Sequence, residues 1–185
     1  MQENLIKQEY ERLVYRKRFT QVVKHVLYTL LGVASVAILI AVMWLPVLRI
    51  YGHSMNATLA EGDVVFSVKS SDFKTGDVLA FYYNNKILVK RVIAKGGDWV
   101  NIDHDGNVFV NQKKLDEPYV SDLSLGDSDI TYPFQVPENR LFVIGDQRAT
   151  SVDSRHKVIG TIAEEQIVGK IVFRIYPLNR IGLIK

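Results

Sequence analysis

Two residues of this chain, Ser54 and Lys90, are of types that could do chemistry together. Lys90 lies in a run typical of a buried strand, where alternation places it on the same face as Leu88, Val92 and Ala94. Burial among aliphatic side chains disfavours the ammonium form and lowers the pKa of a lysine. Because a neutral lysine can accept the proton of a serine hydroxyl, the pair predicts a nucleophile and its base.

Each of these residues also has a plainer interpretation. Lys90 could extend to a strand edge or pair with a carboxylate, and Ser54 could be an ordinary exposed serine. A serine–histidine pair is a further alternative, because the segment after the apolar run contains three histidines as well as Ser54: His53, His104 and His156. His53 is adjacent to Ser54 and would point away from it in an extended chain, and His104 falls in an expected turn. His156 is therefore the alternative base.

A third polar cluster follows the expected strand at residues 141–144. Residues 145–155 contain two Asp, two Arg, two Ser and one Thr. Such a loop can hold itself together by Asp–Arg pairing, and it could offer a hydroxyl to orient a neighbouring lysine. Asp146 and Asp153 alone do not complete a metal site, so the sequence predicts neither a metal centre nor a cofactor.

The segments after residue 49 have mostly the patterns of short strands. We expect strands at residues 63–69, 78–83, 87–94, 108–110, 141–144 and 167–176, with residues 99–102 continuing the strand at 87–94. Residues 121–133 are polar and indicate an exposed loop. The expected fold is mostly β, an antiparallel coiled sheet or partly closed barrel behind one N-terminal transmembrane helix.

One apolar run is long enough to cross a membrane. Residues 26–48 contain no Asp, Glu, Lys or Arg. As a helix this run would span roughly 34 Å, against a bilayer core of about 30 Å. A cleaved secretory signal has a shorter apolar core and a small-residue ending. A buried core helix is the other alternative, and we interpret the run as an uncleaved anchor.

The charges around the run predict its orientation. Residues 1–25 carry six Lys or Arg against three Glu, whereas the following flank has only Arg49 before Glu61 and Asp63. The positive-inside rule then places residues 1–25 in the cytoplasm, residues 26–48 in the membrane and residues 49–185 outside, at the cell membrane. The chain has no cysteine, which excludes thiol catalysis and disulfides. No basic stripe interleaved with aromatic residues indicates nucleic-acid binding.

Taken in order, these motifs resemble the conserved boxes of the type I signal peptidases. The matching residues are Ser54-Met55, Thr58-Leu59, Gly62-Asp63, Gly76-Asp77-Val78, Lys90-Arg91, Gly97-Asp98, Gly145-Asp146-x-Arg148 and Ser151-x-Asp153-Ser154-Arg155. The resemblance covers roughly residues 26–176. The short chain and single anchor are similar to the Gram-positive form.

The resemblance implies a membrane-bound serine endopeptidase with a Ser/Lys dyad. Ser54 would be the nucleophile, Lys90 the general base and later acid, and Ser151 the hydroxyl that orients the lysine. The backbone N–H of Ser54 would contribute to the oxyanion hole. Four further positions would support the site: Asp146, Arg148, Asp153 and Arg155. The implied partners are the lipid bilayer and exported preproteins with small residues before the cut.

The chain departs from the family pattern at three positions. Ala57 stands where proline is usual, Gln147 where asparagine is usual, and Gly52 where some members have a serine that donates to the oxyanion. A non-catalytic family member acting as an assembly scaffold is a rival reading. The presence of both Ser54 and Lys90 argues against it, because a scaffold needs neither.

Overall fold

The computed structural model describes the backbone of residues 2–44 and 46–184, and the side chains of residues 11–40 and 46–184. The chain divides into two compact units, Met1–Trp44 and Leu45–Lys185. The first unit is the single helix α1, Gln2–Trp44. Within it, Glu11–Ile40 contains an 18-residue window with a mean hydropathy of 1.9, so it is long and apolar enough to cross a membrane. Its side chains are almost all exposed.

The helix ends before the apolar run does. Val47 and Leu48, which the sequence assigned to the membrane span, lie instead in the short strand β1, Val47–Arg49. Pro46 precedes β1 and has no backbone N–H to continue a helix. Leu48 packs against a buried core cluster of the second unit, so this end of the run belongs to the β unit.

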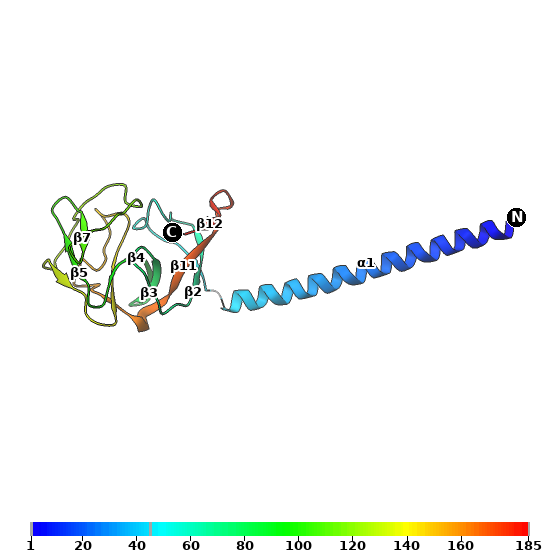
Figure 1. Ribbon diagram of the computed structural model, residues 1–185, viewed down its shortest axis with the longest axis horizontal. Coiled ribbons are helices and arrows are strands. Elements are labelled where there is room, and N and C mark those ends of the chain that lie inside the picture. The colour runs from blue at the N-terminus through cyan, green and yellow to red at the C-terminus, as the bar shows by residue number, and fades with distance from the viewer. Residues whose placement is uncertain (1, 45, 185) are drawn as a thin grey trace. The chain divides into compact units, whose positions relative to one another are not determined.

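The second unit contains two antiparallel sheets, which confirms the predicted mostly β fold (Figure 1). The larger sheet has the strand order β1-β2-β11-β3-β4-β9-β10, with β12 also paired to β11. Its remaining strands are β2 (Val64–Val68), β3 (Val78–Tyr83), β4 (Lys86–Lys95), β9 (Arg140–Ile144), β10 (Ile162–Ala163), β11 (Ile167–Tyr176) and β12 (Gly182–Leu183). The path is open, and among the described residues β1 and β10 do not pair to close a barrel.

The smaller sheet has the order β7-β6-β5-β8. Its strands are β5 (Trp99–Ile102), β6 (Val108–Val110), β7 (Lys113–Lys114) and β8 (Phe134–Gln135). Two short 3-10 turns complete the unit, η1 (Glu164–Gln166) and η2 (Leu178–Arg180).

The expectation that residues 99–102 continue β4 is wrong. The chain turns at Gly97, which has φ +87°, a conformation that glycine adopts without strain. The Asp98 carboxylate accepts the backbone N–H of Lys95 at 2.9 Å and closes this turn. The chain then enters β5 and the second sheet.

The core explains why β4 is buried at its centre. One cluster joins residues of β4 and β9 to residues of β5 and β6, so it packs the two sheets together. A second cluster lies beneath residues 50–59, and a third includes Leu79, Phe81 and Val92. Since core side chains contact both faces of β4, Lys90 and Arg91 are both almost inaccessible, at 3% and 1% exposure.

Candidate active site

Ser54 lies in the turn that connects β1 to β2. The turn is fixed by two apolar side chains, Met55 and Leu59, which are buried in the core cluster beneath it. The backbone N–H of Leu59 donates to the Met55 carbonyl at 2.7 Å, and that of Asn56 donates to the His53 carbonyl at 2.9 Å. Ser54 itself is only half-buried, so its hydroxyl lies at the surface of a turn that the core holds in place.

Lys90 reaches the same place from the middle of β4. Its Nζ donates to Ser151 Oγ at 3.0 Å, inside the protein. Burial is the main cause that lowers the pKa of Lys90 to about 8. The negative charges of Asp153 and Asp146 oppose this shift, and the positive charge of Arg155 adds to it. The predicted desolvation of this lysine is confirmed.

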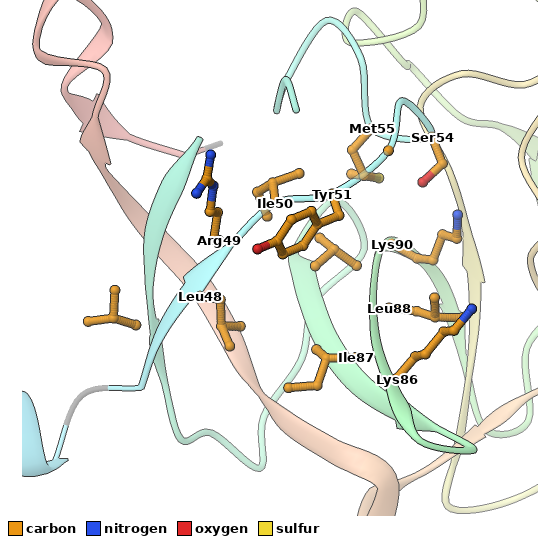
Figure 2. A pocket seen from close by; sticks show the side chains of 13 residues that line it. Leu48, Arg49, Ile50, Tyr51, Ser54, Met55, Lys86, Ile87, Leu88 and Lys90 are labelled. Atoms are coloured by element: carbon orange, nitrogen blue, oxygen red, sulfur yellow. The ribbon is translucent and has the colours of Figure 1, made fainter. Parts of the chain in front are cut away.

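The structure brings the two residues together at one pocket. Figure 2 shows the Ser54 hydroxyl and the Lys90 amino group directed toward each other. Both line a pocket of about 600 Å³ whose walls are residues 47–52, 54 and 55 on one side and residues 86–90 on the other. The serine therefore lies beside a lysine that readily loses its proton.

The loop at residues 145–155 closes on this pair from a third direction. The backbone N–H of Gln147 donates to the Ser54 carbonyl oxygen at 3.0 Å, so the loop is bound to the serine's own turn. Gly145 makes this approach feasible: a Cβ there would collide with the Ser151 hydroxyl and lie 2.6 Å from the Ser54 carbonyl oxygen. Any larger residue at Gly145 would push Ser151 and Ser54 apart.

Asp146 ties the loop to both the lysine strand and the serine turn. Arg91, the neighbour of Lys90, donates to its two carboxylate oxygens at 2.8 Å each. Thr58, from the serine turn, donates to the same carboxylate at 2.5 Å. A bidentate ion pair of this kind fixes orientation as well as distance. Asp146 thus holds three separate segments in register.

Asp153 and Arg155 hold the loop's own backbone. The Asp153 carboxylate accepts Arg155 Nε at 2.8 Å and the backbone N–H of Gly145 at 3.0 Å. Burial alone would raise the pKa of Asp153, but hydrogen bonds and the charge of Arg155 outweigh it and hold this pKa below its usual value. Arg155 also donates to the Ser151 carbonyl oxygen at 3.0 Å, next to the hydroxyl that receives Lys90.

Arg148 is paired with a residue that the sequence did not single out. It donates to the Gly145 carbonyl at 3.1 Å, and its guanidinium forms a two-pronged ion pair with Glu117 at 2.5 and 3.1 Å. Both side chains are nearly inaccessible. Tyr119 donates to Glu117 at 3.0 Å and lies with its ring 3.8 Å from the guanidinium carbon of Arg91.

Glu117 and Tyr119 therefore form a buried polar layer with the two arginines. Burial is the main cause that raises the pKa of Tyr119, so its phenol stays protonated and remains a donor. The sequence indicates this layer only indirectly: if Arg148 is buried, a carboxylate elsewhere in the chain must pair with it. Nothing in the spacing selects Glu117 from the several acids between residues 116 and 129.

The alternative histidine bases are not gathered at the pocket. His156 Nδ1 accepts the backbone N–H of Asp153 at 3.4 Å, and the pocket walls, as far as the chain is described, include no histidine. His53 is exposed and lies 3.3 Å from Glu61. His104 is exposed in the turn between β5 and β6.

The departure at Ala57 has a structural counterpart. Ala57 has φ 83°, in the left-handed region, whereas a proline ring fixes φ near −65°. The turn after Ser54 is therefore one that proline cannot adopt. Gly52 also has a positive φ, 82°, and space is free around it.

Comparison with known proteins assigns this chain to a family. The family model described as signal peptidase, peptidase S26, matches residues 22–176. The chain belongs to this family. The match begins within α1 and ends at the last residue of β11, so it includes the complete site. Signal peptidases are hydrolases, and this chain is one of them.

Individual relatives agree with the family assignment. Signal peptidase I of Streptococcus pneumoniae serotype 4 is 32% identical over 173 residues, covering 72% of this chain and 83% of the relative. Signal peptidase IB of Staphylococcus aureus is 39% identical over 150 residues, covering 70% and 77%. A crystal structure of a signal peptidase I from Enterococcus faecalis has 27% identity and a TM-score of 0.44, covering 54% of this chain and 97% of that one.

Proposed function

We propose that this protein is a membrane-anchored serine endopeptidase that cleaves N-terminal signal peptides from exported preproteins through a Ser54/Lys90 dyad. The observation that carries the proposal is the orientation of the Ser54 hydroxyl toward a buried lysine whose pKa is lowered to about 8 (Figure 2). At pH 7, a pKa of 8 leaves about one lysine in ten neutral, against about one in three thousand at a pKa of 10.5. A general base must be neutral to accept a proton, and only the lower pKa gives a substantial neutral fraction.

The reaction then takes two steps. Ser54 Oγ attacks the scissile carbonyl while Lys90 takes its proton, and Lys90 returns that proton to the leaving amine. The signal peptide remains as an ester on Ser54. Lys90 next takes a proton from water, the hydroxide attacks the ester, and the proton returns to Ser54 as the signal peptide leaves with a free carboxylate. The backbone N–H of Ser54 stabilises the oxyanion in both steps.

The surrounding residues act on the dyad without reacting. Ser151 accepts a hydrogen bond from Lys90 and directs its amino group. Asp146, Arg148, Asp153 and Arg155 hold the loop that carries Ser151. Rigid positioning of this kind matters because misplacement by about 1 Å can cost roughly a hundredfold in rate.

Two unpaired strand edges offer a place for the substrate. In the part of the chain that the structure describes, β1 is the end strand of its sheet and β4 pairs with β9 only from Arg91 onward. Residues 86–90 there pair with β3 alone. These segments form the opposite walls of the pocket. An extended preprotein segment can add to such an edge through its backbone. Small side chains, at the first and third positions before the cut, would enter the apolar space lined by Met55, Ile87 and Val89.

The apolar helix supplies the anchor in this proposal. Residues 26–44 would lie within the membrane, with residues 1–25 in the cytoplasm and residues 49–185 outside. The six basic residues before position 26 support this orientation. A site close in the chain to the anchor suits a substrate whose cleavage point emerges just beyond the bilayer.

A cleavage assay with a model preprotein in detergent tests the proposal. Ser54→Ala and Lys90→Ala should abolish cleavage, and His156→Ala should retain it. Lys90→Arg is the matched control for charge, because arginine cannot lose its proton, and it should also be inactive. Full activity in Lys90→Ala would refute the dyad. A wild-type protein that cleaves no preprotein would favour the scaffold reading.

A further inference from the structure

Lys86 is a charged residue of the pocket wall that the proposed chemistry does not use. It is the first residue of β4 and is exposed. From Tyr83–Lys86 to Leu79–Lys90, the pairing of β3 with β4 runs without a bulge, so side chains alternate regularly along this stretch. Lys86 therefore shares its face with Leu88 and Lys90, while Ile87 points to the other side (Figure 2).

The pocket has positive charges and no negative one. Among the described residues that line it, the charged ones are Arg49, Lys86 and Lys90, and none is an Asp or Glu. Lys90 is bound to Ser151, and the Arg49 guanidinium lies 5.8 Å from the centre of the Tyr51 ring. Within the described chain, no carboxylate lies within 4 Å of the Lys86 amino group. Lys86 is thus an exposed cation on the β4 wall that is available to a ligand.

Strand geometry gives the substrate position that would meet Lys86. A strand rises about 3.3 Å per residue, so Lys86 lies about 13 Å along β4 from Lys90, where the cut occurs. Substrate side chains one and three residues before the cut face the side of Ile87 and Val89. Side chains two, four and six residues before it then face the side of Lys86.

The direction of the substrate follows from the proposed function. The apolar space that would take the first and third side chains before the cut is lined by Ile87 and Val89, between Lys90 and Lys86. The part of a preprotein that precedes the cut therefore runs from Lys90 toward Lys86. Lys86 lies four residues before Lys90 on β4, so it lies opposite the fourth substrate residue before the cut. If the long Lys86 side chain extends outward along the strand, its amino group reaches the sixth residue instead.

We propose that Lys86 is a specificity-determining residue that favours an acidic side chain at the fourth or sixth position before the cut and disfavours a basic one. The inference rests on the proposed peptidase function. An exposed ion pair changes binding by about 1.4- to 5-fold, and a like charge acts in the opposite direction by a similar factor. Peptides with Asp and with Lys at this position should therefore differ by roughly 2- to 25-fold.

The test uses the full chain in neutral detergent with three series of signal-peptide substrates. Each series carries Asp, Asn or Lys at one position: the fourth, fifth or sixth residue before the cut. For the fourth or sixth position, we expect KM to rise from Asp to Asn to Lys with kcat nearly unchanged. Lys86→Ala should remove this order and Lys86→Glu should reverse it. High salt should weaken the preference, because the pair is exposed.

Two controls separate this role from a general effect of charge. Lys114→Ala removes an exposed lysine of the second sheet and should keep the wild-type preference. At the fifth position the side chain faces away from Lys86, so any preference there should be the same in Lys86→Ala.

The outcomes separate this proposal from the peptidase function itself. If the wild type does not cleave the Asn peptides, the peptidase function is refuted and this proposal with it. If the wild type cleaves all three peptides with equal KM, or keeps its preference in Lys86→Ala, the role of Lys86 alone is refuted. The same assay is repeated with the protein in anionic vesicles. If Lys86→Ala then loses activity equally for all peptides, with no loss in neutral detergent, the proposal is refuted and Lys86 acts on lipid instead.

Discussion

The buried lysine carries a cost in stability that can be measured directly. Its pKa falls from 10.5 to about 8 in the folded protein. A shift of this size corresponds to about 3 kcal/mol at 1.36 kcal/mol per pH unit. The folded protein therefore holds the ammonium form less well than the unfolded chain does. The free energy of unfolding should rise with pH between about 8 and 10.5, and below pH 8 the whole penalty is present.

Lys90→Met removes this penalty and keeps the length of the side chain. It also leaves Ser151 Oγ without its donor, which costs about 1 kcal/mol. The net expectation is an inactive protein that is about 2 kcal/mol more stable at pH 7. For a β unit of this size, the midpoint of thermal unfolding should rise by roughly 5–8 °C.

The measurement is denaturant unfolding of the full chain in detergent, followed by the fluorescence of its two tryptophans, Trp44 and Trp99, at pH 7 and pH 10.5. The advantage of Lys90→Met should shrink and reverse at the higher pH, where the wild-type lysine is already neutral. Lys95→Met, at the exposed end of the same strand, is the control and should change stability little at either pH. If Lys90→Met is clearly less stable than the wild type at pH 7, the lysine is a satisfied ammonium and the argument for a neutral base fails.

Three further substitutions test the framework around the dyad. Gly145→Ala should lower kcat by about a hundredfold, because its methyl group displaces Ser151 and the Ser54 carbonyl; Gly182→Ala, with nothing within 4 Å, should have normal kinetics. Glu117→Gln should destabilise the fold by about 3–5 kcal/mol in urea unfolding, since it leaves a buried guanidinium without its carboxylate; unchanged stability would contradict the pairing. Ala57→Gly should raise stability by about 0.5 kcal/mol by relieving the positive φ, measured as a higher unfolding midpoint.

The burial of Lys90 was predictable because alternation is a local property. Its pairing with β3 is regular, so Lys90 shares a face with Leu88 as the alternation predicts. The prediction fails for Ala94, because the pairing of β4 with β9 shifts after Val92 and Ala94 joins the core cluster of Ile93. The mostly β fold followed for the same reason, from short alternating runs between turns. Local patterns therefore sufficed for the strand that carries the proposed base.

The wrong predictions concern sequence patterns that are compatible with two different structures. An apolar run does not distinguish a membrane span from a core strand, so Val47 and Leu48 were assigned to the helix although they belong to β1. Likewise, residues 99–102 have the alternation of a strand, but the pattern does not say to which sheet a strand belongs. The turn at Gly97 decides that question, and its geometry is not visible in hydrophobicity.

The polar layer of Glu117 and Tyr119 was missed because its contacts span long distances in sequence. Glu117 meets Arg148 across 31 residues. Such a pair depends on how the loop after β7 folds back over the 145–155 loop, which no local spacing encodes.

The unpaired edges of β1 and β4 have a consequence for the protein when no substrate is present. A strand edge with free backbone groups is a template for pairing with another copy of the same chain, and hence for aggregation. Here the two open segments carry Arg49 and Lys86, both exposed. Charged side chains on an edge discourage like edges from joining, since two copies would bring like charges together. The same cations would thus keep neighbouring molecules from occupying one another's pockets where the enzyme is crowded.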